Sequence, residues 1–455
     1  MYTGMWDAKV DRVPMLALSG QVDTQVVGTG AFQEVDLVAG FEAVAPFNHR
    51  VQRDSKHAEL MTLAVKNAVL RREVSHLTFP DEVQVHPVGD EVPAGTLENR
   101  ITPLEIHPPQ DMLDKAVGMI QKAQRPAIIM GHGARFHKEA IIKLAETLNC
   151  AVFTTFKGKG LISDQHELGC GVLGRSGTPI ASWFMNEADL LLVFGASFSN
   201  HTGITAKIPT IQVDFDPMSL AKFHSIDCML YGELGVTVAA IRKALPEGTS
   251  APDQRAEIAE RWAIWRAEKQ RRLLDDKGKG VSSIAIFEAM NRHVPGNAVI
   301  AVDVGNNTYS FGRYFECTDQ AVLMSGYLGS IGFGYPAAMG AWAAAPDRPI
   351  FAVTGDGGFG QYMAELNTAV MYNMPIKHVL LNNSELGKIS KEQRTAQLDV
   401  WKTTLSNPNF ADYANSCGAL GIRVTDASQL DEALAKALAH DGPAMVEVMA
   451  DSSLI

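Results

Sequence analysis

The chain has 455 residues, of which 46% are hydrophobic and 20% charged, a composition typical of a globular protein that is too long for a single core. Its formal net charge of -11 argues against nucleic acids and anionic membrane surfaces as partners, because their negative charge would repel it. The longest apolar runs, such as the one within residues 188–195, have strand length, which excludes a membrane-spanning helix of roughly 20 residues.

The cysteines and the start of the chain indicate a reducing compartment. The chain opens without a basic stretch followed by an apolar one, so we expect no signal peptide and a cytoplasmic location. The cysteines are odd in number and form no Cys-x-x-Cys pair, so we expect free thiols. They are Cys150, Cys170, Cys228, Cys317 and Cys417.

Strand-like and helical segments alternate along the whole chain, which predicts a parallel α/β architecture in three blocks. The first block, residues 1–85, begins almost directly in a strand (13–18), followed by a helix (56–71) and a second strand (74–79). A doubly wound domain usually has on the order of 150 residues. We therefore expect this first domain to be incomplete.

A linker rich in proline and glycine, residues 83–95, precedes the second block, residues 112–245. There we expect a helix at 141–148 and strands at 126–130, 151–154, 190–194 and 210–214. The charged helix predicted at 255–274 has the pattern of a solvated connector and leads to a hinge at 277–280. The third block covers residues 281–455.

The most informative segment is one βαβ unit within residues 349–383. A buried strand (350–354) leads into the tight turn Gly355-Asp356-Gly357-Gly358, and a helix (359–373) precedes a second strand (376–381) that ends in Asn382-Asn383. A right-handed crossover places both loops at the carboxyl edge of the sheet.

Asp356 and Asn383 can therefore meet at one point. A carboxylate and an amide oxygen are ligands that Mg²⁺ prefers, and a diphosphate would supply further oxygens. The glycines allow the backbone to approach phosphates, and the helix N-terminus attracts them. A lone Gly-Asp-Gly also occurs in hairpin turns, but the strand–turn–helix–strand context favours a Mg²⁺–diphosphate site.

Gly-Asp-Gly followed one crossover later by Asn-Asn resembles the signature of the thiamine diphosphate enzymes of the pyruvate oxidase and acetolactate synthase group. The resemblance covers nearly the whole chain and implies three doubly wound parallel-sheet domains (pyrimidine-binding, middle and diphosphate-binding), the first incomplete. It also implies that Asp356, Asn383 and the backbone carbonyl of Glu385 bind Mg²⁺. Further cofactor contacts would come from Gly355, Gly357, Gly358, Leu386 and Gly387.

Two further segments fit the same resemblance. Residues 325–334 look like the loop beneath the cofactor, which implies that the Gly329 carbonyl accepts from the 4′-amino group and that Ile331 is the apolar wedge that bends the cofactor. Outside this context Ile331 would be an ordinary core residue. Asp303-Val304-Gly305-Asn306-Asn307 matches the loop that touches the diphosphate through Gly305 and Asn306, although Gly-Asn-Asn is also common in turns.

Three residues are similar to catalytic ones of the group. Glu392 falls where pyruvate oxidases have a glutamate facing the intermediate and acetolactate synthases have a tryptophan; alternatively it is an exposed glutamate paired with Lys388 or Lys391. Phe32 and Gln33 resemble residues that enter the partner subunit's active site, which implies a homodimer or homotetramer. The alternative places Phe32 in the core and Gln33 in solvent.

Four loops of the middle block end predicted strands, at residues 131–134, 154–160, 195–198 and 213–217. In oxidases and synthases of the group the corresponding loops hold FAD, so FAD is a possible cofactor. Asp214 would then bind a ribose, or it caps a turn.

The resemblance begins only at about Tyr2, so no residue matches the group's activating glutamate. We favour an N-terminally incomplete version of an active enzyme, because a truncated sheet exposes strand edges and apolar surface. The alternative is a short form that binds thiamine diphosphate with little turnover.

The function we expect is decarboxylation of a 2-oxo acid, pyruvate, with oxidation of the enamine. An acetolactate synthase-like carboligase and a non-catalytic regulatory subunit are the alternatives. A nicotinamide-dependent dehydrogenase is disfavoured, because Gly131-His132-Gly133 is followed by Phe136 where the third glycine should stand.

Overall fold

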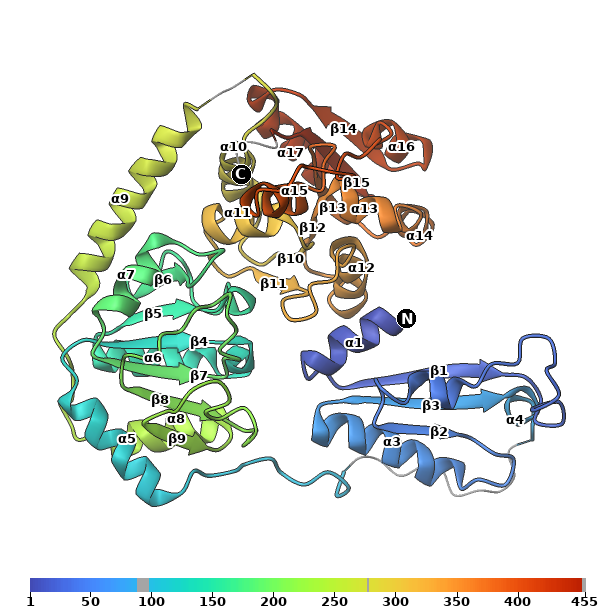
Figure 1. Cartoon of the computed structure of the whole chain (residues 1–455), viewed down its shortest axis with the longest axis horizontal. Coiled ribbons are helices and arrows are strands. Elements are labelled where there is room, and N and C mark those ends of the chain that lie inside the picture. The colour runs from blue at the N-terminus through green and yellow to red at the C-terminus, as the bar shows by residue number, and fades with distance from the viewer. Residues whose placement is uncertain (88–97, 276–277, 452–455) are drawn as a thin grey trace. The chain divides into compact units, whose positions relative to one another are not determined.

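The computed structural model describes residues 1–87, 98–275 and 278–451. It contains three β-sheets in which every pair of neighbouring strands is parallel, which confirms the predicted fold class (Figure 1). The chain divides into two compact units, residues 1–104 with 327–329, and residues 105–326 with 330–455. No helix within the described ranges is both long and apolar enough to cross a membrane.

The first unit contains a three-stranded sheet in the order β1-β3-β2. The expectation that the chain begins almost directly in a strand is wrong, because a helix precedes β1 and buries Met5 and Ala8 against Val74. The expected linker begins in a short helix, and its residues 88–95 lie outside the described part. The elements are α1 (Tyr2–Val10), β1 (Met15–Gln21), α2 (Leu37–Phe41), β2 (Phe47–Arg50), α3 (His57–Arg71), β3 (Val74–Pro80) and α4 (Asp81–Gln84).

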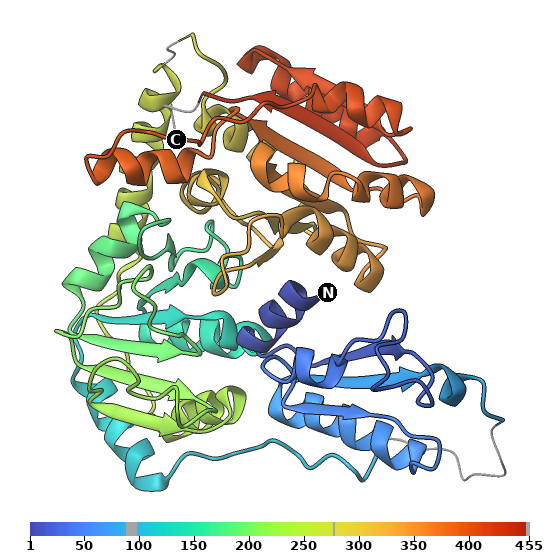
Figure 2. The ribbon, with the colours of Figure 1, turned by 45° about the vertical axis from the view of Figure 1, so that its right-hand side comes forward.

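The middle sheet has six strands in the order β6-β5-β4-β7-β8-β9 (Figure 2, cyan to green). The chain starts at β4 in the centre and winds outward first to one side and then to the other, so the strand order reverses between β4 and β7. The predicted strands β4, β5, β7 and β8 are confirmed at both ends. The strands are β4 (Pro126–Met130), β5 (Ala151–Thr154), β6 (Gly169–Val172), β7 (Leu190–Phe194), β8 (Thr210–Asp214) and β9 (Cys228–Tyr231).

Helices pack on this sheet through apolar faces, and one of them corrects a prediction. The expected solvated connector, α9 (Arg255–Leu273), instead buries Ile258, Trp262 and Trp265, and Trp262 Nε1 donates to the Gly169 carbonyl at 2.8 Å. The other helical elements are α5 (Gln110–Lys122), η1 (His132–Phe136), α6 (Lys138–Leu148), η2 (Phe156–Gly158), α7 (Pro179–Glu187) and α8 (Leu234–Ala244).

The C-terminal sheet has the order β11-β10-β12-β13-β15-β14. Its strands are β10 (Val299–Val302), β11 (Ala321–Met324), β12 (Ile350–Gly355), β13 (Lys377–Asn382), β14 (Leu420–Val424) and β15 (Ala444–Met449). Its helices are α10 (Ser283–His293), α11 (Asn306–Tyr314), α12 (Gly334–Ala344), α13 (Asp356–Tyr362), α14 (Glu365–Met371), α15 (Gly387–Thr395), α16 (Phe410–Ser416), η3 (Ala427–Gln429) and α17 (Leu430–Ala439).

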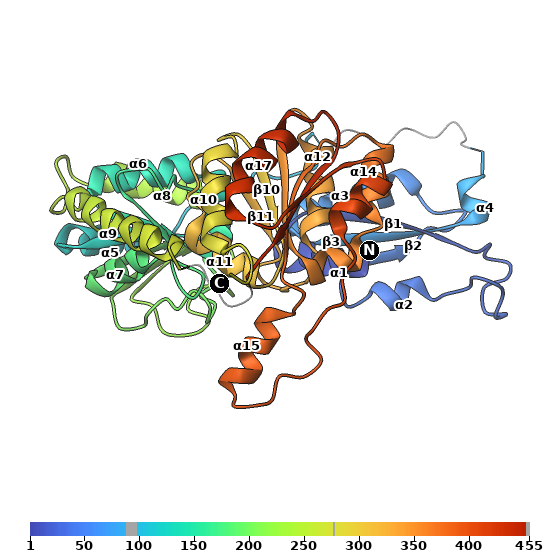
Figure 3. The same cartoon turned by 90° about the horizontal axis from the view of Figure 1, so that it is seen from above.

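Two features of this sheet's central crossover differ from expectation. Asp356 is the first residue of α13 rather than part of a tight turn, and the single helix expected over residues 359–373 is divided into α13 and α14. The next helix, α15, projects away from the sheet (Figure 3). The loops after β12 and β13 still leave the same edge of the sheet, because these strands are parallel and Gly355 pairs with Leu381.

Candidate cofactor site

The carboxyl ends of β10 and β12 form the switch point of the C-terminal sheet. The chain passes from β10 outward to β11 on one side, and β12 lies on the other side of β10 (Figure 1). The loops after β10 and β12 therefore leave toward opposite faces and open a crevice, which is where open α/β sheets bind ligands. Helices α11 and α13 begin at these two loops.

The loops after β10 and β13 of the C-terminal sheet meet at this crevice. A Cβ atom added at Gly387, the first residue of α15, would overlap Asn306 Nδ2 and lie 3.5 Å from Asn383 Nδ2. Asn306 follows β10 and Asn383 follows β13. The structure thus brings together three residues that the sequence had placed in separate motifs.

Asp356 lies at the same crevice and is almost fully buried. Burial raises its pKa, and hydrogen bonds from Asn407 and from the backbone N–H groups of Gly357 and Ser384 partly offset the rise. The Ser384 N–H group belongs to the loop after β13, so the loop that carries Asn383 reaches Asp356. Asn383 Oδ1 accepts from the Glu385 N–H at 3.1 Å. Their binding of Mg²⁺ stays a prediction.

Apolar side chains gather over the glycine at the start of α13. A Cβ atom added at Gly357 would lie 2.8 Å from Leu386 Cδ2, 3.2 Å from Leu405 Cδ1 and 3.9 Å from Ile331 Cδ1. Ile331 is only half-buried, so it is not an ordinary core residue. Gly329 has a φ of +68° and no atom near the position of a Cβ, which leaves its surroundings open.

The polar atoms of the crevice fit a diphosphate with a divalent cation. Asn306 Nδ2 is buried without a hydrogen-bond partner, so its N–H groups are available to donate to a ligand oxygen. Within the part of the chain that is described, no group of three or more His, Cys, Asp or Glu side chains could hold a metal. A cation here would need amide, carbonyl and ligand oxygens beside the one carboxylate of Asp356, which is how Mg²⁺ binds with phosphates.

Sequence reasoning gave no role to two residues beside the crevice, Asp303, which it named only as part of the 303–307 motif, and Asn407. Asp303 is fully buried, and its Oδ1 accepts from the N–H groups of Val304 and Gly332 at 2.6 and 2.9 Å. Burial raises the pKa of Asp303 to about 6. An aspartate directly after a buried strand was the available signal. Asn407, which contacts Asp356, belongs to no motif, so the sequence contained no signal for it.

Glu392 is exposed on α15 and forms an ion pair with Lys388 at 2.7 Å, as the alternative interpretation expected. The hydrogen bond from Lys388 lowers the pKa of Glu392, and the charges of Arg175 and His201 add to the effect. Both belong to the middle domain, so α15 faces loops of that domain. The catalytic role of Glu392 stays a prediction.

In the first unit, Phe32 and Gln33 lie at the surface. Phe32 is 88% exposed, so the alternative that placed it in the core is wrong. Gln33 is exposed, with a φ of +65°. The Glu34 carboxylate accepts from three N–H groups of this loop, those of Gly28, Gly30 and Ala31, and so holds its shape.

The middle sheet has a second crevice, at its own switch point. The loops after β4 and β7 pack backbone to backbone, because a Cβ atom at Gly131 would overlap the Gly195 carbonyl. Burial and the charge of Arg135 lower the pKa of His132 to about 4. Asp214 Oδ1 accepts from the Asp216 N–H at 2.9 Å, which is the turn-capping alternative.

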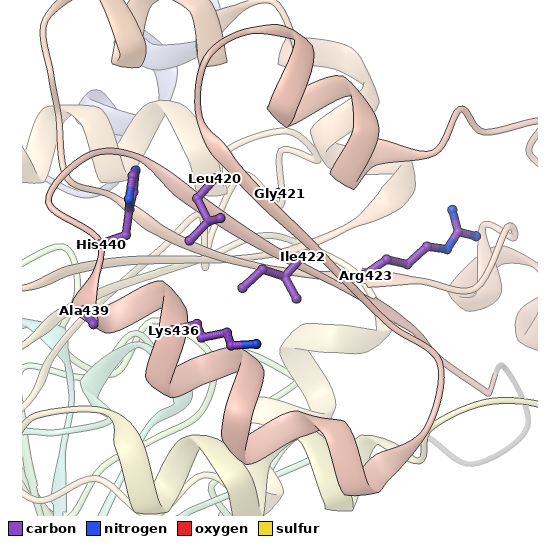
Figure 4. A pocket seen from close by; sticks show the side chains of 7 residues that line it. All are labelled: Leu420, Gly421, Ile422, Arg423, Lys436, Ala439 and His440. Carbon is purple, nitrogen blue, oxygen red and sulfur yellow. The ribbon is translucent and has the colours of Figure 1, made fainter.

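A groove beside the edge strand β14 lacks comparable chemistry. Leu420, Ile422 and Lys436 line it, and the side chain of Arg423 points away from Lys436 (Figure 4). Lys436 forms an ion pair with Glu432 at 2.6 Å. We therefore assign the site to the crevice at β10 and β12.

Comparison with known proteins supports this assignment. The family description "Thiamine pyrophosphate enzyme, C-terminal TPP binding domain" matches residues 303–448, and "Thiamine pyrophosphate enzyme, central domain" matches residues 113–241. The chain is 32% identical to the putative thiamine pyrophosphate-containing protein YdaP of Bacillus subtilis over 99% of this chain and 78% of the relative. It is 31% identical to a probable acetolactate synthase large subunit of Methanococcus aeolicus, over 100% of this chain and 80% of the relative. It is 26% identical to the pyruvate oxidase of Lactiplantibacillus plantarum, over 99% of this chain and 75% of the relative.

Proposed function

The chain belongs to the thiamine pyrophosphate enzyme family, and we propose that it catalyses the oxidative decarboxylation of pyruvate with thiamine diphosphate and Mg²⁺. The observation that carries the proposal is the meeting of Asp356, Asn306, Asn383 and Gly387 at one crevice, with the Asn306 amide left without an acceptor.

In this proposal different residues in the loops of the C-terminal sheet bind Mg²⁺ and the diphosphate. Asp356, Asn383 and the Glu385 carbonyl hold Mg²⁺. Asn306 and the backbone at Gly305, Gly355, Gly357 and Gly358 bind the diphosphate.

Apolar residues and one backbone group then orient the rest of the cofactor. Ile331 and Leu386 shape the apolar surface beside Gly357, and the Gly329 carbonyl accepts from the amino group. Thiamine diphosphate, when bound, supplies the nucleophile and the electron sink for loss of CO₂.

One observation favours an oxidase over a carboligase. Glu392 stands on α15 with Lys388 and Arg175 near it, a polar and charged setting rather than the apolar pocket of an indole. We propose that the switch point between β4 and β7 holds FAD, because open α/β sheets bind ligands there; FAD would fit an oxidase and a carboligase equally and does not separate the two. Phe32 and Gln33 would complete the site of a second subunit, as part of a homodimer or homotetramer.

The first test is calorimetric titration of the purified chain with thiamine diphosphate, with and without Mg²⁺. We expect Mg²⁺-dependent binding that Asp356→Ala weakens at least about 100-fold, since it removes the only carboxylate of the proposed ligand set. Asp319→Ala, which removes an exposed aspartate, is the matched control. Binding that is equal in all three proteins would contradict the proposal.

Product analysis then separates the activities. With pyruvate and an artificial electron acceptor, an oxidase releases CO₂ and consumes the acceptor, whereas a carboligase forms acetolactate and leaves the acceptor oxidised. A chain that binds the cofactor tightly and yields neither product would be the short binding form.

A further inference from the structure

Asn407 contacts the proposed metal ligand from a distant part of the chain. It lies in the loop between α15 and α16, 51 positions from Asp356. Its Nδ2 donates to Asp356 Oδ2 at 2.6 Å and to Asn382 Oδ1 at 2.9 Å. The two hydrogens of one amide group therefore serve two acceptors.

A buried carboxylate behind Asn382 fixes the direction of this contact. Glu447 on β15 has no exposed surface; its Oε1 accepts from Asn382 Nδ2 at 2.7 Å, and its Oε2 accepts from the Ala411 N–H at 3.0 Å. Both oxygens of Glu447 accept hydrogen bonds, and Arg423 Nη1 lies 3.6 Å from its Oε2. Asn382 therefore turns its NH₂ group toward Glu447 and its Oδ1 toward Asn407. Asn407 must then present its own NH₂ group.

We propose that Asn407 is a positioning residue that fixes the Asp356 carboxylate for the divalent cation; this rests on the proposed function of Asp356. The Asn407 N–H on Oδ2, together with the backbone N–H groups of Gly357 and Ser384, restricts rotation of the carboxylate, and we expect Oδ1 to be the oxygen that faces the cation. The hydrogen-bonded series Glu447–Asn382–Asn407–Asp356 thus links a buried residue of the sheet to the carboxylate at the crevice and fixes the direction in which each side chain points.

The chemistry of the cation makes this inference testable. Mg²⁺ requires near-ideal octahedral geometry, whereas Ca²⁺ tolerates irregular coordination. Removing an orienting partner of a metal ligand typically weakens metal binding 10–100-fold. Loss of Asn407 should therefore weaken Mg²⁺ binding much more than Ca²⁺ binding, a difference that general damage to the fold would not produce.

The experiment measures the Kd of Mg²⁺ and of Ca²⁺ by calorimetry on the full chain with saturating thiamine diphosphate. For Asn407→Ala we expect a roughly 10–100-fold higher Kd for Mg²⁺ and a change of less than about 3-fold for Ca²⁺. The matched control is Asn409→Ala, because Asn409 lies on the same loop but caps α16 through the Asp412 N–H at 3.2 Å. That variant should leave both Kd values within about 3-fold.

A second variant protects the test against a folding defect at Asn407. Glu447→Gln keeps the shape of the side chain, does not touch Asp356 and allows Asn382 to turn around. It should raise the Kd of Mg²⁺ in the same direction by about 3–10-fold. Equal weakening of Mg²⁺ and Ca²⁺, or identical behaviour of Asn407→Ala and Asn409→Ala, would overturn the inference and leave the proposed function intact. A wild-type chain without Mg²⁺-dependent cofactor binding would overturn both.

Discussion

Asp303 has no exposed surface, and its Oδ2 is buried without a hydrogen-bond partner. Burial raises its pKa from 3.8 to about 6, so the carboxyl group holds its proton more tightly in the folded chain than in the unfolded chain. Such a group favours folding below its unfolded pKa and loses that contribution as the pH rises through its folded pKa. Two pKa units correspond to about 3 kcal/mol.

Replacing Asp303 with asparagine should remove this pH dependence. We expect the free energy of unfolding of the wild type, relative to Asp303→Asn, to fall by about 3 kcal/mol as the pH rises from about 4 to 7. Urea denaturation of both proteins across this range measures the difference. A difference that stays constant with pH would show that Asp303 ionises normally in the fold.

At this scale the sequence predicted residues within short motifs and missed those that act across the fold. Asp356 and Asn383 could be predicted, because Gly-Asp-Gly and Asn-Asn stand at the ends of two recognisable strands. Asn407 could not, because its contact with Asp356 depends on the path of an irregular loop. For Glu392 the sequence left two alternatives open, a catalytic glutamate or an exposed one paired with a nearby lysine. The structure shows the ion pair with Lys388, which the sequence alone could not select.

At the scale of an element, helix α13 of the candidate site contains two glycines with different surroundings, Gly358 and Gly360. A Cβ atom at Gly358 would overlap Asp303 Oδ2, whereas Gly360 has nothing within 4 Å. Both lie within the helix, where alanine is favoured over glycine by about 1 kcal/mol.

Alanine substitutions should therefore act in opposite directions. Gly360→Ala should raise the free energy of unfolding by about 0.5–1 kcal/mol through helix propensity alone. Gly358→Ala should lower it by about 1–3 kcal/mol, because the added methyl group must displace a buried carboxylate. Chemical denaturation of the pair measures both effects, and a stabilised Gly358→Ala variant would mean that Asp303 can move away freely.

Strands were the elements that the sequence predicted best. β4, β5, β7 and β8 are buried along their whole length and read as continuous apolar runs. Helix boundaries were less predictable: the glycine-rich start of α13 looked like a turn, and α9 looked solvated because its charged residues hide the spacing of its buried tryptophans. In both cases tertiary packing overrode the local pattern.

At the scale of the whole molecule, alternation of strands and helices predicted the sheets but not how the middle and C-terminal sheets join. That joint depends on residues with no sequence pattern. Asp164 of the middle domain forms two hydrogen bonds with the backbone of Cys317 in the C-terminal domain. Its N–H donates to the Cys317 carbonyl at 2.7 Å, and its side-chain Oδ2 accepts from the Cys317 N–H at 2.8 Å. Lys159 forms an ion pair with the same Oδ2 at 3.0 Å, and both side chains are buried.

This buried pair gives the last prediction, on the coupling of the two domains. Lys159→Met keeps the apolar stem but leaves Asp164 charged and without its cation, which should cost about 3–5 kcal/mol of unfolding free energy. The double variant Lys159→Met/Asp164→Asn keeps the acceptor for the Cys317 N–H and removes the uncompensated charge, so it should recover at least half of that loss. Differential scanning calorimetry should show the domains unfolding in separate transitions in the single variant and closer together in the double one. If the single variant unfolded like the wild type, the ion pair would contribute nothing to the joint, which would then depend on the Asp164–Cys317 hydrogen bonds and on apolar packing.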